Sequence, residues 1–160
     1  MKNTPQYGFQ SYLSQEFPSQ IVIDVTELCN MSCIHCPQTD FARSAAFGNR
    51  NLDLAIHKKL IDEVAKDGKD CCKYLRYTGQ GETLLHPNFM EMILHSLAYA
   101  KVPINITTNG MLLKEKMAKT LIESGVDVID ISIDANTAET YALIRRKGNF
   151  DTTRTNVLNL

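Results

Sequence analysis

The sequence predicts an α/β fold in which parallel strands alternate with helices. Short stretches rich in Ile and Val alternate with longer stretches whose apolar residues recur at helical spacing, which is typical of βαβ units. Each of the four predicted strands has one aliphatic side and one polar side, since alternate residues face opposite sides of a sheet. A parallel sheet between two helical layers would be apolar on both sides. We therefore expect a curved sheet of four parallel βα units, a partial (β/α) TIM-like barrel whose polar concave face lines a wet cavity.

The composition is that of a globular domain. The chain has 160 residues, of which 44% are hydrophobic and 22% charged, and its formal net charge is -1. These values exclude a disordered chain, indicate no membrane association and give no electrostatic reason to expect a nucleic acid partner. Five cysteines, three of them clustered, favour a reducing, cytoplasmic setting.

The first part of the chain leads into a strand and a long loop. Residues 1–20 are polar and lack periodicity, so we expect an N-terminal arm before a core domain over residues 21–160. The first strand covers residues 21–25, and a loop that contains the clustered cysteines follows it. Asp53 can cap a helix over residues 54–67.

The rest of the chain repeats the alternation of strand and helix. The predicted strands cover residues 73–78, 104–108 and 126–133, and the predicted helices cover residues 87–100, 112–124, 138–144 and 152–160. Asp24 and Arg76 fall on the polar sides of the first two strands, and we expect an ion pair between them. We expect Cys71 and Cys72 to be packing residues, and three histidines on or beside helices to be surface or capping residues: His57, His86 and His95.

The loop after the first strand carries the strongest chemical signal. Cys29, Cys33 and Cys36 have the spacing C-x3-C-x2-C, so a short loop can turn all three sulfurs toward one point. Three thiolates suit a soft metal centre such as a [4Fe-4S] cluster, in which one iron would stay open to another ligand. A zinc site with His35 or another histidine as fourth ligand is the alternative, whereas a disulfide suits three close cysteines poorly.

Polar residues also follow the other predicted strands, at the end where (β/α) barrels collect their active sites. Gly79 and Gly81 let the backbone approach a ligand closely, and Glu82 supplies a carboxylate for an ammonium group. The alternative for this segment is an ordinary turn between strand and helix with a solvated glutamate.

The cysteine motif and the strand ends together resemble the core domain of the radical S-adenosylmethionine (SAM) superfamily. Thr78-Gly79-Gln80-Gly81-Glu82 resembles the family's glycine–glutamate motif, and Thr107-Thr108-Asn109-Gly110 resembles its T-N-G ending of the third strand. The segment 131–135, followed by Tyr141 and Arg145, is similar to members with a SPASM or twitch extension. Two positions depart from the family pattern: His35 stands where an aromatic residue is usual, and Thr83 where a proline is usual.

The resemblance implies a role for each matching residue. Cys29, Cys33 and Cys36 would ligate the [4Fe-4S] cluster, and His35 would lie near the adenine or the cluster. The SAM amino group would bind Glu82 and the backbone of Gly79, Gln80 and Gly81, while Ser132 and Asp134 would reach the ribose. Asn109 would be a further cofactor-binding residue, and Arg145 would pair with the SAM carboxylate, the alternative for residues 145–147 being a solvated basic turn.

The resemblance also implies an activity and partners. A reduced cluster would cleave SAM to methionine and a 5′-deoxyadenosyl radical, which abstracts hydrogen from an unidentified small-molecule or peptide substrate. An electron donor such as flavodoxin or ferredoxin would reduce the cluster. The family barrel has six βα units, so we expect a core domain truncated at its C-terminus, or one that a second copy of the chain completes. An iron–sulfur electron carrier and a zinc-stabilised binding module are the competing hypotheses.

Overall fold

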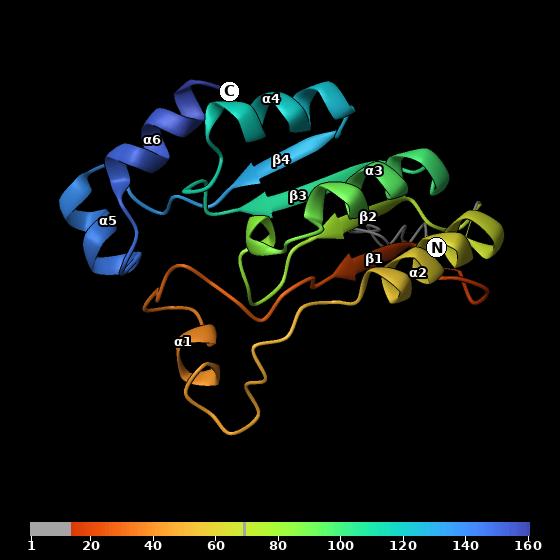
Figure 1. Cartoon of the computed structure of the whole chain (residues 1–160), viewed down its shortest axis with the longest axis horizontal. Helices are drawn as coiled ribbons and strands as arrows, with labels where there is room; N and C mark the ends of the chain where they lie inside the picture. Colours follow the sequence, from red (N-terminus) through yellow and green to blue (C-terminus); the bar gives the residue numbers. More distant parts are fainter. Residues whose placement is uncertain (1–13, 69) are drawn as a thin grey trace, which may run out of the picture.

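The computed structural model describes residues 14–68 and 70–160, which form a four-stranded parallel sheet with helices against it (Figure 1). The strands lie in sequence order: β1 (Gln20–Ile23), β2 (Tyr74–Tyr77), β3 (Ile104–Thr108) and β4 (Val128–Ile131). Every neighbouring pair is parallel. The predicted α/β fold with four parallel βα units is therefore confirmed. The predicted N-terminal arm lies largely outside the described residues, and residues 14–19 carry no helix or strand.

Helices follow each strand, and the bounds of the five longer ones, α2 to α6, lie within about three residues of those predicted, whereas the short α1 and η2 were not predicted. They are α1 (Gln38–Phe41), α2 (Leu54–Asp67), the 3-10 helix η2 (Thr83–Leu85), α3 (Phe89–Tyr99), α4 (Glu115–Ser124), α5 (Ala138–Ile144) and α6 (Phe150–Leu158). Asp53 caps α2 as predicted, because its carboxylate accepts hydrogen bonds from the backbone N–H groups of Ala55 and Ile56. Gly125 ends α4 with a φ of 85°, a left-handed conformation that glycine adopts at little cost.

The hydrophobic core lies on one face of the sheet only. Leu75, Tyr77, Ile104 and Ile106 project from β2 and β3 into this core, where α2, α3 and α4 pack on them. The opposite face is open, and on it Val22 is 54% exposed. This one-sided burial agrees with the alternation of aliphatic and polar sides in the sequence.

The predicted ion pair between Asp24 and Arg76 on the open face is wrong, because Arg76 pairs with another carboxylate. The Arg76 guanidinium lies 3.3 Å from the Asp130 carboxylate and donates to the Thr107 hydroxyl. The Asp24 carboxylate instead accepts a hydrogen bond of 3.0 Å from the backbone N–H of Gln80. Thr107 lies opposite Asp130 in the register of β3 and β4, so the Arg76 guanidinium contacts both side chains. The Asp24 carboxylate is instead engaged by the loop after β2.

His57 is also placed wrongly by the sequence, since it is fully buried between α2 and the sheet. Its ring Nε2 lies 2.7 Å from the Tyr77 hydroxyl, which in turn lies 2.5 Å from the Ser96 hydroxyl. Burial lowers the pKa of His57 to about 4 and raises that of Tyr77. His86 is a capping residue as expected, because its Nδ1 accepts from the Asn88 N–H. Cys72 is buried in the core.

All four strands point toward one end of the molecule, where α1 and α5 lie (Figure 1). The loops that follow the strands therefore meet at that end, which is where parallel sheets place their ligand sites. Within the described part of the chain, no helix combines the length and apolar composition that crossing a membrane requires.

Candidate functional site

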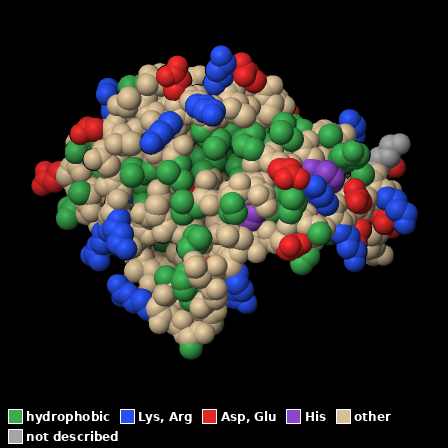
Figure 2. Space-filling view, in the orientation of Figure 1, with side chains coloured by type: hydrophobic (Ala, Val, Ile, Leu, Met, Phe, Trp, Pro, Cys, Tyr) green, Lys and Arg blue, Asp and Glu red, His purple; other side chains and the backbone are tan. Residues whose placement is uncertain are grey.

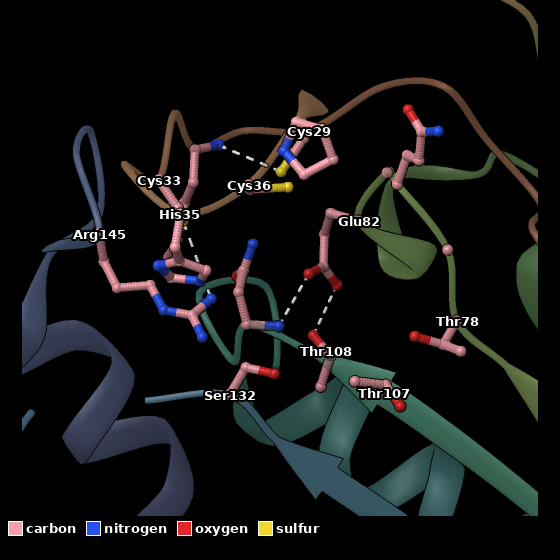
Figure 3. A pocket seen from close by; sticks show the side chains of 16 residues that line it. Cys29, Cys33, His35, Cys36, Thr78, Glu82, Thr107, Thr108, Ser132 and Arg145 are labelled. Carbon is pink, nitrogen blue, oxygen red and sulfur yellow. Dashed lines mark hydrogen bonds between the residues drawn. The ribbon is translucent and has the colours of Figure 1, made fainter. Parts of the chain in front are cut away.

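A pocket of about 300 Å³ lies at the C-terminal ends of the strands. Eleven of the twelve predicted site residues line it: Cys29, Cys33, His35, Cys36, Gly79, Gln80, Gly81, Glu82, Asn109, Ser132 and Arg145. Figure 3 shows the cysteine loop along one side of this pocket, with Glu82 entering from one flank and Arg145 from the other. The twelfth residue, Asp134, does not line the pocket but contacts two residues that do.

The cysteine loop is held from two directions. The backbone N–H of Ser32 donates to the Arg146 carbonyl at 2.9 Å, and that of Ile34 donates to the Ile144 carbonyl at 3.0 Å. We call these two bonds the backbone clamp. On the other side, the Asn109 amide donates to the Asn30 side-chain oxygen at 2.7 Å. The loop is therefore fixed to the ends of both α5 and β3.

The thiols of this loop sit in a partly apolar environment. Burial raises the pKa of Cys29 and of Cys33, and the Arg145 guanidinium, 3.8 Å from the Cys33 sulfur, opposes this rise at Cys33. Among the described residues, no group of three or more His, Cys, Asp or Glu side chains is set to hold one metal ion. A four-iron cluster does not need such convergence, because each cysteine ligates a different iron.

The loop after β2 requires glycine at positions 79 and 81, because neighbouring atoms of the protein leave no space there for a side chain. A Cβ on Gly81 would overlap the Thr26 carbonyl oxygen, and a Cβ on Gly79 would overlap the Asp24 carboxylate. The close approach that we expected toward a ligand is thus an approach to the end of β1. As a result, the loop packs closely against the segment that leads to the cysteines, and its residues 79–82 line the pocket.

Glu82 is buried, and donors of its own chain surround its carboxylate. One oxygen accepts from the Thr108 hydroxyl at 2.5 Å and from the Leu84 N–H, and the other accepts from the Asn109 N–H at 2.8 Å. Burial raises the pKa of Glu82, and these hydrogen bonds oppose the rise. The solvated glutamate considered as an alternative is thereby ruled out, and Glu82 ties η2 to the end of β3.

Arg145 is the main cationic group of the pocket. It is only 8% exposed, forms an ion pair with Asp134, and donates toward Cys33. Its Nε is buried and has no hydrogen-bond partner among the described residues. Asp134 adopts a φ of 60° and also lies 3.5 Å from the His35 ring. The solvated basic turn considered for residues 145–147 therefore does not apply to Arg145.

Sequence reasoning missed several residues that build the site. Thr108 and Asn30 hold Glu82 and Asn109, and Asp24 supports the loop after β2. Thr78 and Thr107 line the pocket, and Figure 3 shows both beside Glu82. Thr78, Thr107 and Thr108 belong to the motif segments quoted from the sequence, but no role was assigned to them, and no sequence signal singled out Asn30.

The residues present fit a cluster and SAM. Three thiols lie on one side of a single pocket, as a [4Fe-4S] cluster with one open iron requires. The unpartnered Nε of Arg145 is a buried donor that a carboxylate would satisfy. Hydrogen-bonding groups at Asn109 and Ser132 offer further contacts for a nucleoside.

Comparison with known proteins agrees with this chemistry. Residues 23–160 match the family model of the Radical SAM superfamily. The chain is 34% identical over 130 residues to GTP 3′,8-cyclase of Chlorobaculum tepidum, covering 81% of this chain and 37% of the cyclase. It is 28% identical over 134 residues to the mycofactocin maturase MftC of Mycobacterium tuberculosis, covering 84% of this chain and 32% of the maturase. The chain thus spans about a third of the length of these relatives.

Solved structures show the same fold. The crystal structure of BtrN in complex with AdoMet and 2-DOIA superposes with a TM-score of 0.66 at 25% identity, over 78% of this chain and 49% of BtrN. The match of the family model extends over most of the chain, from β1 to α6. The chain therefore belongs to the radical SAM superfamily.

Proposed function

We propose that this chain forms the cluster- and SAM-binding part of a radical SAM enzyme. The observation that carries the proposal is the placement of Cys29, Cys33 and Cys36 in one pocket with the buried, unpartnered Nε of Arg145. The cysteines would hold a [4Fe-4S] cluster, and the pocket between them and Arg145 would hold SAM. When bound, the cluster and SAM supply one-electron cleavage of SAM to methionine and a 5′-deoxyadenosyl radical.

The chain's own residues bind and orient SAM. Arg145 would donate from its unpartnered Nε to the SAM carboxylate, while the ion pair with Asp134 holds the guanidinium in position. Gly79 and Gly81 line the pocket, and their backbone carbonyls would serve as acceptors for the SAM ammonium group, because the Glu82 carboxylate already accepts from Thr108 and Asn109. Ser132, at the end of β4, takes the ribose.

His35 lines the pocket on the side of Arg145. Its ring lines the pocket and lies 3.5 Å from the Asp134 carboxylate, which keeps the ring near Arg145 (Figure 3). A ring in this place can stack against the adenine, as the usual aromatic residue of the family would.

The substrate is a peptide or a small molecule, and the enzyme works in the cytoplasm. GTP 3′,8-cyclase acts on a small molecule by its name, and MftC is a maturase, so relatives of both kinds support this breadth. The polar open face of the sheet beside the pocket, with Arg76, Asp130 and Asn105, supports a polar substrate.

Anaerobic reconstitution with iron and sulfide tests the proposal. We expect the reduced chain to give a cluster signal in electron paramagnetic resonance that changes on addition of SAM. Replacement of Cys29, Cys33 and Cys36 by Ala should abolish the signal, whereas Cys72→Ala, a buried cysteine outside the pocket, should preserve it. Arg145→Gln should keep the cluster and weaken SAM binding, measured directly by equilibrium dialysis, by about tenfold or more.

Two outcomes would contradict the proposal. A cluster signal that SAM leaves unchanged, without SAM binding in dialysis, would indicate an iron–sulfur electron carrier. Stoichiometric zinc in place of iron, lost together with the three cysteines, would indicate a zinc-stabilised binding module.

A further inference from the structure

A second hollow lies on the open face of the sheet. This hollow, of about 340 Å³, is lined by the residues with which β2, β3 and β4 begin, whereas the pocket lies where these strands end. We call it the sheet groove. Among the described residues, the groove and the pocket have no lining residue in common.

The sheet groove is nevertheless close to the pocket. Arg76 lines the groove, and Thr78, two residues further along the chain, lines the pocket. The Arg76 guanidinium also lies 3.4 Å from the hydroxyl of Thr107, which lines the pocket and is drawn on β3 in Figure 3. Two residues of a strand span about 7 Å. A ligand longer than this can therefore occupy the groove and reach the pocket.

Three side chains meet in the sheet groove at one oxygen atom. Asp130 Oδ2 accepts from Asn105 Nδ2 at 2.9 Å and from Arg76 Nη2 at 3.3 Å. A carboxylate only accepts, so the amide of Asn105 must present its nitrogen to Asp130 and its oxygen elsewhere. That oxygen is buried and has no hydrogen-bond partner among the described residues. A donor from a ligand would satisfy it.

The same cluster has two further atoms that are free to bind a ligand. Within the described part of the chain, Asp130 Oδ1 and Arg76 Nη1 make no hydrogen bond. The cluster therefore offers two acceptors, on Asn105 and Asp130, and one donor, on Arg76. The charges of the groove lining cancel, since it holds two cations, Lys73 and Arg76, and two anions, Asp127 and Asp130. An uncharged ligand group with two donors and one acceptor is thus the best match.

An ordinary surface ion pair is the alternative explanation of this cluster. Charged side chains of both signs are scattered around the surface drawn in Figure 2. In an exposed pair such as Lys58 with Glu91, the two side chains hydrogen-bond only to each other among the described residues. Arg76 and Asp130 differ, because Asn105 bonds to the same carboxylate and is left with a buried, unpaired oxygen.

We propose that the sheet groove is a specificity subsite for the substrate, in which Arg76, Asn105 and Asp130 bind a primary carboxamide. The amide nitrogen of this group donates to Asn105 Oδ1 and Asp130 Oδ1, and its oxygen accepts from Arg76 Nη1. The inference rests on the proposed function and names the substrate chemistry of that enzyme. It places the carboxamide, such as that of an Asn or Gln side chain, about 7 Å or more from the reacting carbon beside SAM.

Small probes test the subsite. Benzamide carries the carboxamide, benzoate replaces it by a carboxylate, and N,N-dimethylbenzamide lacks both N–H donors. A fourth probe is myo-inositol, whose neighbouring hydroxyls also donate and accept. Each probe is titrated into the reconstituted, oxidised and SAM-saturated chain, and binding is followed by heteronuclear NMR of the ¹⁵N-labelled protein. The same titrations on the iron-free chain keep the test independent of the cluster.

We expect benzamide to bind with a dissociation constant of about 1 mM and to shift the side-chain amide signal of Asn105. The other three probes should bind about tenfold or more weakly. Asn105→Ala should weaken benzamide binding about tenfold, and SAM affinity should stay within about twofold. The control is Asn159→Ala, at an exposed asparagine that follows α6, which should leave benzamide binding within about twofold.

Asp130→Asn separates recognition from a merely structural role. It leaves Arg76 without its carboxylate partner and gives the groove lining an excess of one positive charge. Benzoate should then bind better than benzamide, which reverses the preference of the unmodified chain. If Asn105→Ala disturbs folding, this reversal carries the test.

Equal binding of benzamide and benzoate to the unmodified chain would overturn the proposal, as would the absence of benzamide binding or tighter binding of myo-inositol. A preference for benzamide that Asp130→Asn leaves unchanged would do the same. A failure of the proposed function looks different, because the cluster signal would then be insensitive to SAM in every variant, whatever the benzamide titration showed.

Discussion

Gly81 lies so close to the end of β1 that its position leaves no space for a side chain. A Cβ there would overlap the backbone oxygen of Thr26, which cannot move without displacing the cysteine-bearing segment. Gly48 presents the opposite case, because the atoms nearest to its added Cβ belong to the flexible Arg50 side chain. The two glycines therefore provide a matched comparison.

We predict that Gly81→Ala lowers the free energy of unfolding of the chain by about 3 kcal/mol or more, because the backbone must shift to relieve the overlap. Urea denaturation followed by circular dichroism measures this effect. Gly48→Ala should cost less than about 1 kcal/mol, since the arginine can rotate away. Equal effects of the two substitutions would show that the loop after β2 is not packed as described.

His57 makes stability depend on pH. Its folded pKa of about 4 lies below the ordinary value of 6.5, so the unfolded chain takes up the proton first. The stability is complete above about pH 6.5 and is lost as the pH falls toward 4. We predict a loss of about 2 kcal/mol between pH 7.5 and pH 5 from this residue, measured by urea denaturation at both values.

The control for this prediction is His57→Gln, which can still hydrogen-bond to the Tyr77 hydroxyl but does not titrate in this range. Its loss of stability between the two pH values should be smaller than that of the unmodified chain by the predicted amount. A parallel dependence in both proteins would remove His57 as the cause.

Among the elements, η2 and β3 are joined by the Glu82 carboxylate and by a hydrogen bond from the Thr83 hydroxyl to the Thr107 carbonyl. Both oxygens of Glu82 face backbone N–H groups, one from Leu84 and one from Asn109. A glutamine in this position must turn its amide nitrogen toward one of these donors, whichever way the amide is oriented. Glu82 is thus a structural connection in the protein before any cofactor binds.

We predict that Glu82→Gln lowers the free energy of unfolding of the cofactor-free chain by about 1–3 kcal/mol, because one buried donor loses its acceptor. Glu91→Gln, at an exposed ion pair with Lys58, should change it by less than about 1 kcal/mol. Unfolding in urea without iron or SAM measures both. Unchanged stability in Glu82→Gln would assign the residue to ligand binding alone.

The helices and strands with a clear hydrophobic period were predictable from the sequence. Very short helices, and contacts that depend on tertiary packing, were not. The helix over Leu54–Asp67 was predicted in full because it has both a cap and a periodic stripe. His57 could have been placed in the core, because it lies four and seven residues before the buried Ile61 and Val64. The four residues of α1 are too few to show a period.

The site was predictable where its residues are adjacent in the sequence. The cysteine motif and the segment 79–82 are local patterns, and parallel strands bring them together at one end of the sheet. The partner of Arg76 and the contact between Asn30 and Asn109 depend on register and loop conformation, which local patterns do not encode.

At the scale of the whole molecule, the sheet has two open edges among the described residues. β1 pairs with β2 and β4 pairs with β3, and neither has a second neighbour in the described sheet. Unpaired edges of this kind favour association with another chain. A second copy that completes the barrel stays a prediction.

We predict that the chain associates as its concentration rises, and that Val128→Lys on β4 weakens this association by placing a charge on the edge strand. Sedimentation velocity over a range of concentrations measures it. Leu94→Lys, which changes a similarly exposed residue on α3, should have little effect. A monomer at all concentrations, or equal effects of both substitutions, would contradict association through β4.

The backbone clamp has a consequence for the order of assembly. It joins Ser32 and Ile34 to residues more than a hundred positions later, so the cysteine loop cannot reach its final shape until Ile144 and Arg146 are in place. During synthesis, the three thiols leave the ribosome long before their support does. We therefore expect the proposed cluster to be inserted only after the end of α5 has folded against the cysteine loop, and the cysteines to be exposed to oxidation before that point.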